Sequence, residues 1–288
     1  MIRQAMYWDA AGNGGARCGL CPHRCFIEEN ASGSCGVRVN RGGTLIASGY
    51  GAVSSVALDP IEKKPLYMFH PGKRILSIGG FGCNLQCRFC QNYEISTSET
   101  AGRVREPSLV SPLEIVELAV KAELDGNIGI AYTYNEPLIS YEFILDCAVQ
   151  AREAGMKNVL VTNGYINREP LEALLPLIDA MNIDLKGFTD GFYRSVGGTL
   201  EPVKETIEEA YKRCHVEVTT LVIPGENEDD IEPIAKWLSD IAPDIPLHLS
   251  RFFPRYRYSD REPTPRETIL ELRETAKKYL KNVFAGNM

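Results

Sequence analysis

The stretch GFGCNLQCRFCQN, residues 80–92, places three cysteines within eight positions: Cys83, Cys87 and Cys90. A closed structural zinc site takes four protein ligands, and a ferredoxin-type iron–sulfur cluster also takes four thiolates. Three thiolates this close together leave one metal coordination position unfilled by the motif. The stretch therefore predicts a metal centre at which chemistry can occur, and a zinc knuckle is the alternative interpretation.

Apolar runs typical of buried strands recur from residue 74 onward, and amphipathic helix patterns separate them. Their β-branched, nearly continuous apolar character suits parallel strands that are covered on both faces. Strand–helix units in succession predict an α/β fold, a partial (β/α)6 TIM-like barrel over residues 71–288, with a doubly wound sheet as the alternative. The expected strands are residues 74–78, 128–132, 158–162, 181–185, 216–222 and 247–252.

Two helix starts are marked by capping boxes. Ser111 and Glu114 have the required spacing, with Pro112 at the first helical position. Thr264 and Glu267 repeat this pattern and predict a C-terminal helix.

Polar and ionisable residues follow several of the expected strands. In parallel barrels the reactive groups lie at the carboxyl ends of the strands. Turn chemistry accounts for the Asn-Gly and Pro-Gly pairs found there. It accounts less well for Glu136, Asp184, Lys186 and His248, so these four residues are candidates for a functional site on one rim of the barrel.

Residues 1–70 differ in composition from the rest and predict a small Cys-rich, metal-binding N-terminal domain. A small, loop-rich region usually needs an additional cross-link to be stable, and a bound metal could provide it. Four thiolates fit a structural zinc ion or an auxiliary iron–sulfur cluster that relays electrons, whereas magnesium and calcium prefer oxygen ligands. His23 could replace one thiol, and four free thiols are the remaining alternative. The thiols belong to Cys18, Cys21, Cys25 and Cys35.

The segment DPIEKKPLYMFHPG, residues 59–72, carries three prolines and is interpreted as a connector between this region and the barrel.

The composition narrows the class of protein. The chain has 288 residues and a formal net charge of -7, which disfavours a nucleic-acid partner held by bulk charge. Its start lacks the apolar core of a signal peptide, and no apolar run is long enough to cross a bilayer, so we expect a cytoplasmic protein that does not bind membranes. An odd number of clustered cysteines argues against disulfides. Cys147 and Cys214 stand apart and are expected to pack in the core.

The motif C-x3-C-x2-C, with aromatic Phe89 before its last cysteine, resembles the signature of the radical S-adenosylmethionine (SAM) superfamily. More closely, the chain resembles the glycyl-radical-enzyme activases of the pyruvate formate-lyase type, and most of all the branch found with Memo-like and AMMECR-like proteins. That resemblance runs through the stretches CGLCPHRC, GSCGVR, DPIEKKPL, FGCNLQCRFCQN, TYNEP, VTNGY, NIDLKG, TLVIPGEN and HLSRFFPRY. The branch continues past its final Gly-Asn with a Cys-Pro-x-Cys-Gly tail, whereas this sequence stops at Asn287-Met288, which puts any site completed by that tail in doubt.

The resemblance implies that Cys83, Cys87 and Cys90 hold three irons of a 4Fe-4S cluster and leave the fourth iron to SAM. A low-potential donor, such as a flavodoxin or ferredoxin, would supply an electron that cleaves SAM to methionine and a 5′-deoxyadenosyl radical. The radical would remove hydrogen from a substrate, which in the activases is a protein glycine. Radical modification of a small molecule or of another protein side chain is the alternative, and a non-catalytic metal-binding module is the least favoured interpretation.

The resemblance also implies a SAM site. Glu136 would accept a hydrogen bond from the methionyl ammonium group, and Lys186 suits the carboxylate. Activases often have an arginine on the fifth strand, where this chain has Thr219 or Thr220. Structural alternatives are a helix-capping role for Glu136, an ion pair of Asp184 with Lys186, and a core position for His248. The residues implied for cofactor binding are Phe89, Asn135, Glu136, Asn163, Asp184, Lys186 and His248.

Overall fold

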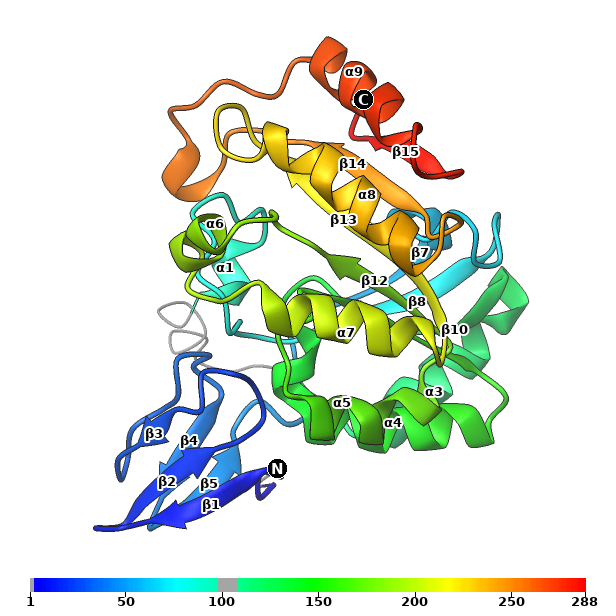
Figure 1. Cartoon of the computed structure of the whole chain (residues 1–288). Helices are drawn as coiled ribbons and strands as arrows, with labels where there is room; N and C mark the ends of the chain where they lie inside the picture. Colours follow the sequence, from blue (N-terminus) through cyan, green and yellow to red (C-terminus); the bar gives the residue numbers. More distant parts are fainter. Residues whose placement is uncertain (1–2, 98–107) are drawn as a thin grey trace.

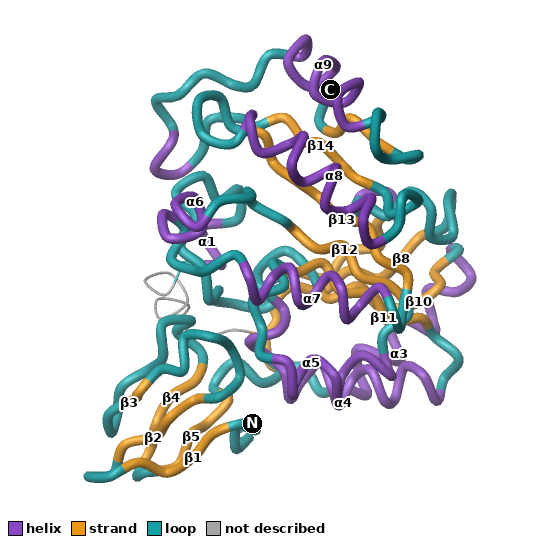
Figure 2. Tube along the Cα trace, viewed as in Figure 1, coloured by secondary structure: helices purple, strands orange, loops and turns teal. Residues whose placement is uncertain are grey.

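The computed structural model describes residues 3–97 and 108–288, and an eight-stranded, mostly parallel sheet forms its centre (Figure 1, Figure 2). Strand β7 runs antiparallel to β8, and all other neighbours are parallel. From one edge to the other, the strands are β7 (Ser55–Pro60), β8 (Arg74–Gly79), β10 (Asn127–Tyr132), β11 (Lys157–Thr162), β12 (Ala180–Asp184), β13 (His215–Val222), β14 (Leu247–Arg251) and β15 (Val283–Gly286).

All of the strands expected from the sequence are present, as β8 and β10 to β14, and each of their ends agrees within one residue. Neighbours in the sheet follow the order of the chain. A doubly wound sheet reverses its order part-way across, so that alternative is wrong. The α/β class is confirmed, and the strand order is that of a partial barrel. The edge strands β7 and β15 were not assigned to the sheet from the sequence.

Both faces of the sheet are buried, which explains the continuous apolar runs. Leu160 and Met181 belong to the main core under the helices, whereas Val159 packs inside the barrel against Ile61 and Leu66. The helices lie along the outer face (Figure 1). They are α3 (Pro112–Lys121), α4 (Tyr141–Glu153), α5 (Arg168–Leu174), α6 (Asp190–Ser195), α7 (Glu201–Tyr211), α8 (Ile231–Ile241) and α9 (Arg266–Ala276), with the short α1 (Tyr93–Ser96) near the cysteine loop.

Short 3₁₀ turns complete the described helical elements. They are η1 (Ile61–Lys63), η2 (Ala122–Asp125), η3 (Pro137–Ser140), η4 (Leu175–Leu177), η5 (Glu228–Asp230) and η6 (Tyr256–Tyr258).

One of the two predicted capping boxes is confirmed. Ser111 Oγ accepts from Glu114 N at 3.2 Å, and Glu114 accepts from Ser111 N at 2.7 Å, at the start of α3. The second box is wrong, because α9 begins after Pro265 without a side-chain cap. Thr264 is fully buried there, and its hydroxyl donates to Val222 O at 2.6 Å instead.

The N-terminal strands form a lobe beside the barrel (Figure 1). A buried ion pair anchors this lobe to helix α4, with Arg38 Nη1 3.0 Å from Glu142 Oε1. Arg38 also donates to Met6 O, and Met6 N donates to Glu142 at 2.6 Å. Removing one partner of such a pair leaves an uncompensated buried charge, which typically costs about 3–5 kcal/mol. The strands are β1 (Trp8–Ala11), β2 (Gly15–Cys18), β3 (Phe26–Ile27), β4 (Arg38–Arg41) and β5 (Thr44–Ala47), and β6 (Ala52–Val53) pairs with β9 (Ser108–Leu109).

The predicted connector is part of the barrel. Strand β7 precedes residue 70 and yet belongs to the central sheet. The domain boundary at residue 70 therefore stays a prediction, and the position of this strand does not support it. The segment after β7 then crosses the amino ends of the parallel strands. Asn182 Nδ2 donates to Pro65 O at 2.8 Å, and the backbone of Tyr67 and Met68 donates to Glu217 at 3.0 and 2.8 Å. This segment therefore forms a floor beneath the barrel.

In the described part of the chain, no helix combines the length and apolar character needed to span a membrane.

Candidate active site

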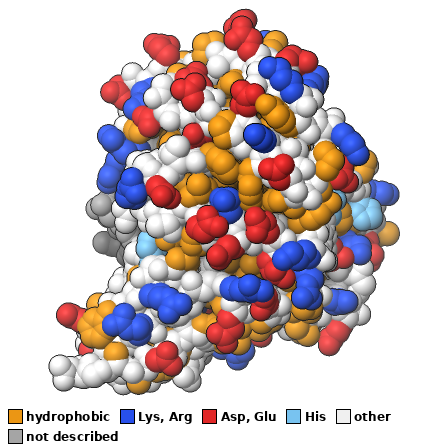
Figure 3. Space-filling view, in the orientation of Figure 1, with side chains coloured by type: hydrophobic (Ala, Val, Ile, Leu, Met, Phe, Trp, Pro, Cys, Tyr) orange, Lys and Arg blue, Asp and Glu red, His pale blue; other side chains and the backbone are white. Residues whose placement is uncertain are grey.

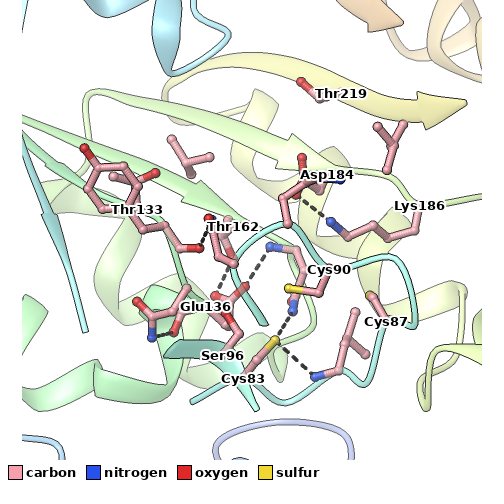
Figure 4. A pocket seen from close by; sticks show the side chains of 18 of the residues that line it. Cys83, Cys87, Cys90, Ser96, Thr133, Glu136, Thr162, Asp184, Lys186 and Thr219 are labelled. Carbon is pink, nitrogen blue, oxygen red and sulfur yellow. Dashed lines mark hydrogen bonds and ion pairs between the residues drawn. The ribbon is translucent and has the colours of Figure 1, made fainter. Parts of the chain in front are cut away.

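A cavity of about 340 Å³ opens at the carboxyl ends of the parallel strands (Figure 4). Its walls come from the loops that follow β8, β10, β11 and β12, where parallel barrels place their functional groups. Every barrel residue predicted for the site lines this cavity except His248. The predicted residues that line it are Cys83, Cys87, Phe89, Cys90, Asn135, Glu136, Asn163, Asp184 and Lys186.

The side-chain amide of Asn135 holds the cysteine loop in place. Its Oδ1 accepts from Gly80 N at 2.8 Å, and its Nδ2 donates to Gly82 O at 3.0 Å. Gly82 has φ +83°, a left-handed conformation that favours glycine. Both ends of the Asn135 amide are thus occupied by the loop, and the residue orients the cysteines.

Two amide groups point at the sulfur of Cys83. Leu85 N lies 3.3 Å and Asn163 Nδ2 3.6 Å from Cys83 Sγ. Asn163 Nδ2 also donates to Asn84 Oδ1 at 2.9 Å, and Asn84 Nδ2 donates to Tyr165 O at 2.7 Å. N–H groups directed at a thiolate or a cluster sulfur stabilise its negative charge. Asn84 was not predicted, since its type and spacing carry no signal of their own.

Glu136 is buried, and its carboxylate is held by three neutral donors. Oε1 accepts from Leu138 N at 2.9 Å and Thr162 Oγ1 at 2.6 Å, and Oε2 accepts from Asn163 N at 2.8 Å (Figure 4). Burial outweighs these hydrogen bonds and raises the pKa of Glu136 to about 7. Glu136 caps the η3 turn through Leu138 N and lines the cavity as well. The capping interpretation is therefore correct, and the SAM-binding role stays a prediction.

Asp184 and Lys186 form an ion pair on the opposite wall, with 2.6 Å between Oδ2 and Nζ (Figure 4). Burial alone would lower the pKa of Lys186, but Asp184 and the nearby thiols raise it. Burial raises the pKa of Cys87 to about 11, while Lys186 acts to lower it. Lys186 therefore stays charged and lies close enough to Cys87 to favour the thiolate.

Aromatic packing fixes the last part of the motif. Phe89 is buried against the rings of Phe192 and Tyr258, with centroids 6.2 and 6.1 Å away.

On strand β13, Thr219 lines the cavity and donates to Asn182 Oδ1 at 3.0 Å, whereas Thr220 donates to the Leu185 carbonyl. Of the two threonines, Thr219 is thus the one that faces the site, and Leu221 of the same strand lines the cavity as well.

His248 lies one layer below the cavity, and the prediction that it helps to bind SAM is not supported. Its Nε2 is 2.6 Å from Glu217 Oε2, and its ring packs against Tyr67 and Phe284. Glu217 also contacts His215 at 2.9 Å. The core interpretation of His248 fits this position, because a buried histidine is stabilised here by a buried carboxylate.

Comparison with known proteins agrees with this geometry. The family model described as the Radical SAM superfamily matches residues 77–238. The chain belongs to the radical SAM superfamily. The matched residues contain the cysteine loop and the strands that build the cavity.

Two archaeal relatives and one solved structure illustrate the similarity. An uncharacterized protein of Methanocaldococcus jannaschii, MJ0808, is 44% identical over 293 residues, which are 100% of this chain and 86% of the relative. A protein of the same organism with the provisional name glycyl-radical enzyme activating enzyme, MJ1227, is 28% identical over 74% of this chain and 89% of its own length. The crystal structure of Streptococcus suis SuiB bound to precursor peptide SuiA superposes with a TM-score of 0.57 at 12% identity, covering 71% of this chain and 46% of that chain, and shows a similar fold.

The cysteine loop fits the 4Fe-4S cluster of this superfamily. Three cysteines on one loop line a single cavity, and two amide groups point at Cys83. Within the described residues, no group of three or more His, Cys, Asp or Glu side chains is gathered as the ligands of one metal ion are. Thiolates that bind three different irons are spaced more widely than the ligands of one ion, so a cluster remains compatible with this arrangement.

The four N-terminal cysteines are neighbours of one another, but they do not share the radical SAM cavity. Burial raises the pKa of Cys21 to about 12, and Cys18, Cys35 and Cys25 contribute in the same direction. They likewise lack the tight grouping of a single-ion site. The metal predicted here stays a prediction. His23 is not placed as a ligand, since its Nε2 lies 2.6 Å from Asn84 O on the cysteine loop.

Proposed function

We propose that this radical SAM enzyme reductively cleaves SAM and uses the resulting 5′-deoxyadenosyl radical to remove a hydrogen atom from a substrate. One observation carries the proposal: three cysteines share a cavity with the buried carboxylate of Glu136 and the partly buried ammonium group of Lys186. A 4Fe-4S cluster bound by Cys83, Cys87 and Cys90 would supply one electron that breaks a carbon–sulfur bond of SAM, giving methionine and the radical.

The chain's own groups would bind and orient SAM. Glu136 suits the methionyl ammonium group, since its Oε2 accepts a hydrogen bond from Asn163 N and, as a carboxylate oxygen, can accept another. Lys186 suits the carboxylate, and Asp184 the ribose hydroxyls. Asn163 would donate hydrogen bonds to Cys83 Sγ and Asn84 Oδ1 and so fix the cysteine loop against the cavity wall. Phe89, packed between rings, would keep water from the reacting atoms.

A protein glycine is the substrate that the relatives favour. MJ1227 carries the name of a glycyl-radical enzyme activating enzyme, and its similarity covers 74% of this chain. Abstraction of hydrogen from the glycine Cα would give 5′-deoxyadenosine and a glycyl radical. Radical modification of a small molecule is the second candidate, because the cavity is enclosed on its floor by the segment around Pro65.

A low-potential donor of the flavodoxin or ferredoxin class would deliver the electron. A nucleic-acid partner is not part of the proposal. On the face shown in Figure 3, basic and acidic side chains are intermixed, as suits a chain of net charge -7.

We also propose that the N-terminal thiols bind a second metal centre, either zinc or an iron–sulfur cluster. The support is the mutual proximity of Cys18, Cys21, Cys25 and Cys35 in a small, loop-rich lobe. Metal analysis of the purified protein and of its Cys21→Ala variant would distinguish zinc from iron.

The experiment that tests the main proposal is anaerobic reconstitution with iron and sulfide, followed by SAM and a strong reductant, with 5′-deoxyadenosine measured by mass spectrometry. We expect product from the wild type and none above background from Cys83→Ala. Cys214→Ala is the matched control, because this thiol bonds to the Ala210 carbonyl away from the cavity. A loaded wild-type cluster that gives no more product than Cys83→Ala would refute the proposal.

A further inference from the structure

Two lysines outside the SAM residues also reach the cavity. Lys63 and Lys64 line it, although they lie between β7 and β8 in the segment that the sequence predicts to be a connector. They occupy the end of the η1 turn and the residue after it. Neither belongs to the loops that carry the cysteines or the residues proposed for SAM.

One carboxylate serves both lysines. Asp59 Oδ1 lies 2.9 Å from Lys63 Nζ, and Asp59 Oδ2 lies 2.7 Å from Lys64 Nζ. The Tyr134 hydroxyl also donates to Asp59 Oδ2 at 2.7 Å, and Lys64 Nζ lies 4.5 Å from the centre of the Tyr134 ring. Burial alone would raise the pKa of Asp59, but the hydrogen bonds from these partners hold it well below its ordinary value. Two ammonium groups therefore face one carboxylate, which leaves one positive charge in excess.

Once Glu136 pairs with the ammonium group of SAM, the other charges of the cavity would not neutralise this excess. Lys186 is paired with Asp184. Glu136 is bonded to neutral groups, and it is the acceptor proposed for the SAM ammonium. Each ammonium group has three N–H donors, and Asp59 accepts one from each of Lys63 and Lys64. Spare donors and spare charge thus remain on the wall that these two residues form.

The two lysines differ in the exposure of their side chains, which suggests different roles. The Lys64 side chain is only 2% exposed and is fixed between Asp59 and Tyr134, whereas the Lys63 side chain is 63% exposed. A fixed charge beside a movable one suits an anion that arrives from solution. Charge-assisted hydrogen bonds are roughly twice as strong as neutral ones.

We propose that Lys63 and Lys64, with Asp59 and Tyr134 behind them, form a subsite for an anionic group of the molecule from which hydrogen is abstracted. The group is a carboxylate or a phosphate. This inference rests on the proposed function, because only a hydrogen-abstracting enzyme has such a substrate. It adds that the substrate carries an anionic group, a property that the residues proposed for SAM binding do not determine.

The test measures binding without turnover, on the anaerobically reconstituted protein with SAM and without reductant. Isothermal titration with succinate and with inorganic phosphate is compared with titration by neutral succinamide. We expect the wild type to bind at least one anion but not succinamide. Lys63→Ala should weaken that anion about tenfold, Lys63→Arg should retain most of the affinity, and Lys121→Ala on helix α3 should match the wild type.

Titration of SAM itself distinguishes the substrate's anion from the carboxylate of SAM. Its affinity should be the same in the wild type and in Lys63→Ala. If Lys63→Ala weakens SAM instead of the probe, the subsite belongs to SAM and the inference is wrong. It is equally wrong if the wild type binds neither anion, or if Lys63→Ala binds both as tightly as the wild type. Because no reductant is present, failure of SAM cleavage leaves these results intact, and the two proposals can fail separately.

Discussion

The molecule holds two sets of clustered cysteines, and the structure gives them different surroundings. Cys83, Cys87 and Cys90 line a cavity with Lys186 and Glu136 beside them. In the N-terminal lobe, Cys18 belongs to the main apolar core. Burial raises the pKa of the thiols in both sets, to about 12 for Cys21 and about 11 for Cys87, so the sets differ in their access to the cavity. Motif spacing alone treats both sets as metal ligands. We therefore expect access to a polar cavity, more than the number of thiols, to separate a reactive site from a structural one.

The segments that carry the two sets are nevertheless in contact. Cys35 packs with Val37 and Ile139 next to Phe81 at the start of the cysteine loop. A Cβ atom on Gly82 would lie 2.3 Å from Cys35 O. The lobe is therefore a support for the loop that carries the barrel cysteines, and the comparison can be tested from either side.

The largest expected effect separates the two sets directly. Cys87→Ala should reduce SAM cleavage at least about a hundredfold, beyond the loss that outer-shell changes at metal sites usually cause. Cys35→Ala should keep cleavage per bound cluster close to that of the wild type while lowering the melting temperature, because Cys35 is buried in apolar surroundings. The measurements are 5′-deoxyadenosine per iron and thermal unfolding. Loss of cleavage in a folded, iron-loaded Cys35→Ala protein would remove the distinction.

The next effect concerns pH, through the carboxylate that only the barrel set has. The pKa of Glu136 is about 7, and its charged form is the one that attracts an ammonium group. SAM affinity should therefore fall about tenfold per unit as the pH drops below 7, and fall again above about 8 as an α-amino group loses its proton. Glu136→Gln should be about ten- to a hundredfold weaker at pH 7.5 and should lack the acid limb. A Glu136→Gln protein with the wild-type pH profile would exclude this carboxylate from SAM binding.

Linkage gives the same group a second readout. In the protein without SAM, the folded-state pKa of Glu136 lies above the ordinary value of 4.5. The folded state then binds more protons than the unfolded state between about pH 4.5 and 7, so its contribution to stability falls as the pH rises through that window. Unfolding in urea at pH 5 and pH 8 should show a smaller loss for Glu136→Gln than for the wild type.

The strands and the cavity residues were predictable because their signals are local. Continuous apolar runs gave the strands within one residue, and the C-x3-C-x2-C spacing gave the loop. Residues whose role depends on distant partners were not predictable. Asn84 acquires its role from Tyr165 and Asn163, and Lys63 lies in a stretch that reads as a connector until the fold brings it to the cavity.

The position of His248 outside the cavity was not predictable for a related reason. Alternation along β14 puts it on the same face as Ser250, which lines the cavity. The sequence pattern predicts which face of the sheet a side chain lies on, but not its depth within the barrel. The depth of His248 is set by its contacts with Glu217 on the neighbouring strand and with the ring of Tyr67. The edge strand β15 escaped prediction because a four-residue strand carries too short a pattern.

A third prediction tests the contact between the two cysteine sets. Gly82→Ala would place a methyl group against Cys35 O at a position with φ +83°, so the loop or the lobe must move. We expect a loss of more than about 2 kcal/mol in the free energy of unfolding, and incomplete iron loading. Gly126→Ala is the matched control, since Gly126 has φ +84° but no atom within 4 Å, and it should cost only about 1 kcal/mol. Equal effects of the two substitutions would mean that the contact with Cys35 contributes nothing.

The smallest expected effect, that of changing His248, tests whether only residues that line the cavity contribute to SAM binding. His248 is a barrel residue, but like the lobe cysteines it packs below or beside the cavity and does not line it. His248→Gln should leave SAM affinity within about twofold and lower the free energy of unfolding by about 1–2 kcal/mol, because Glu217 keeps His215 and two backbone donors. Calorimetric titration with SAM and urea unfolding measure the two quantities. A His248→Gln protein that is fully stable but binds SAM ten times more weakly would return this histidine to the SAM site and show that the layer seen here is not decisive.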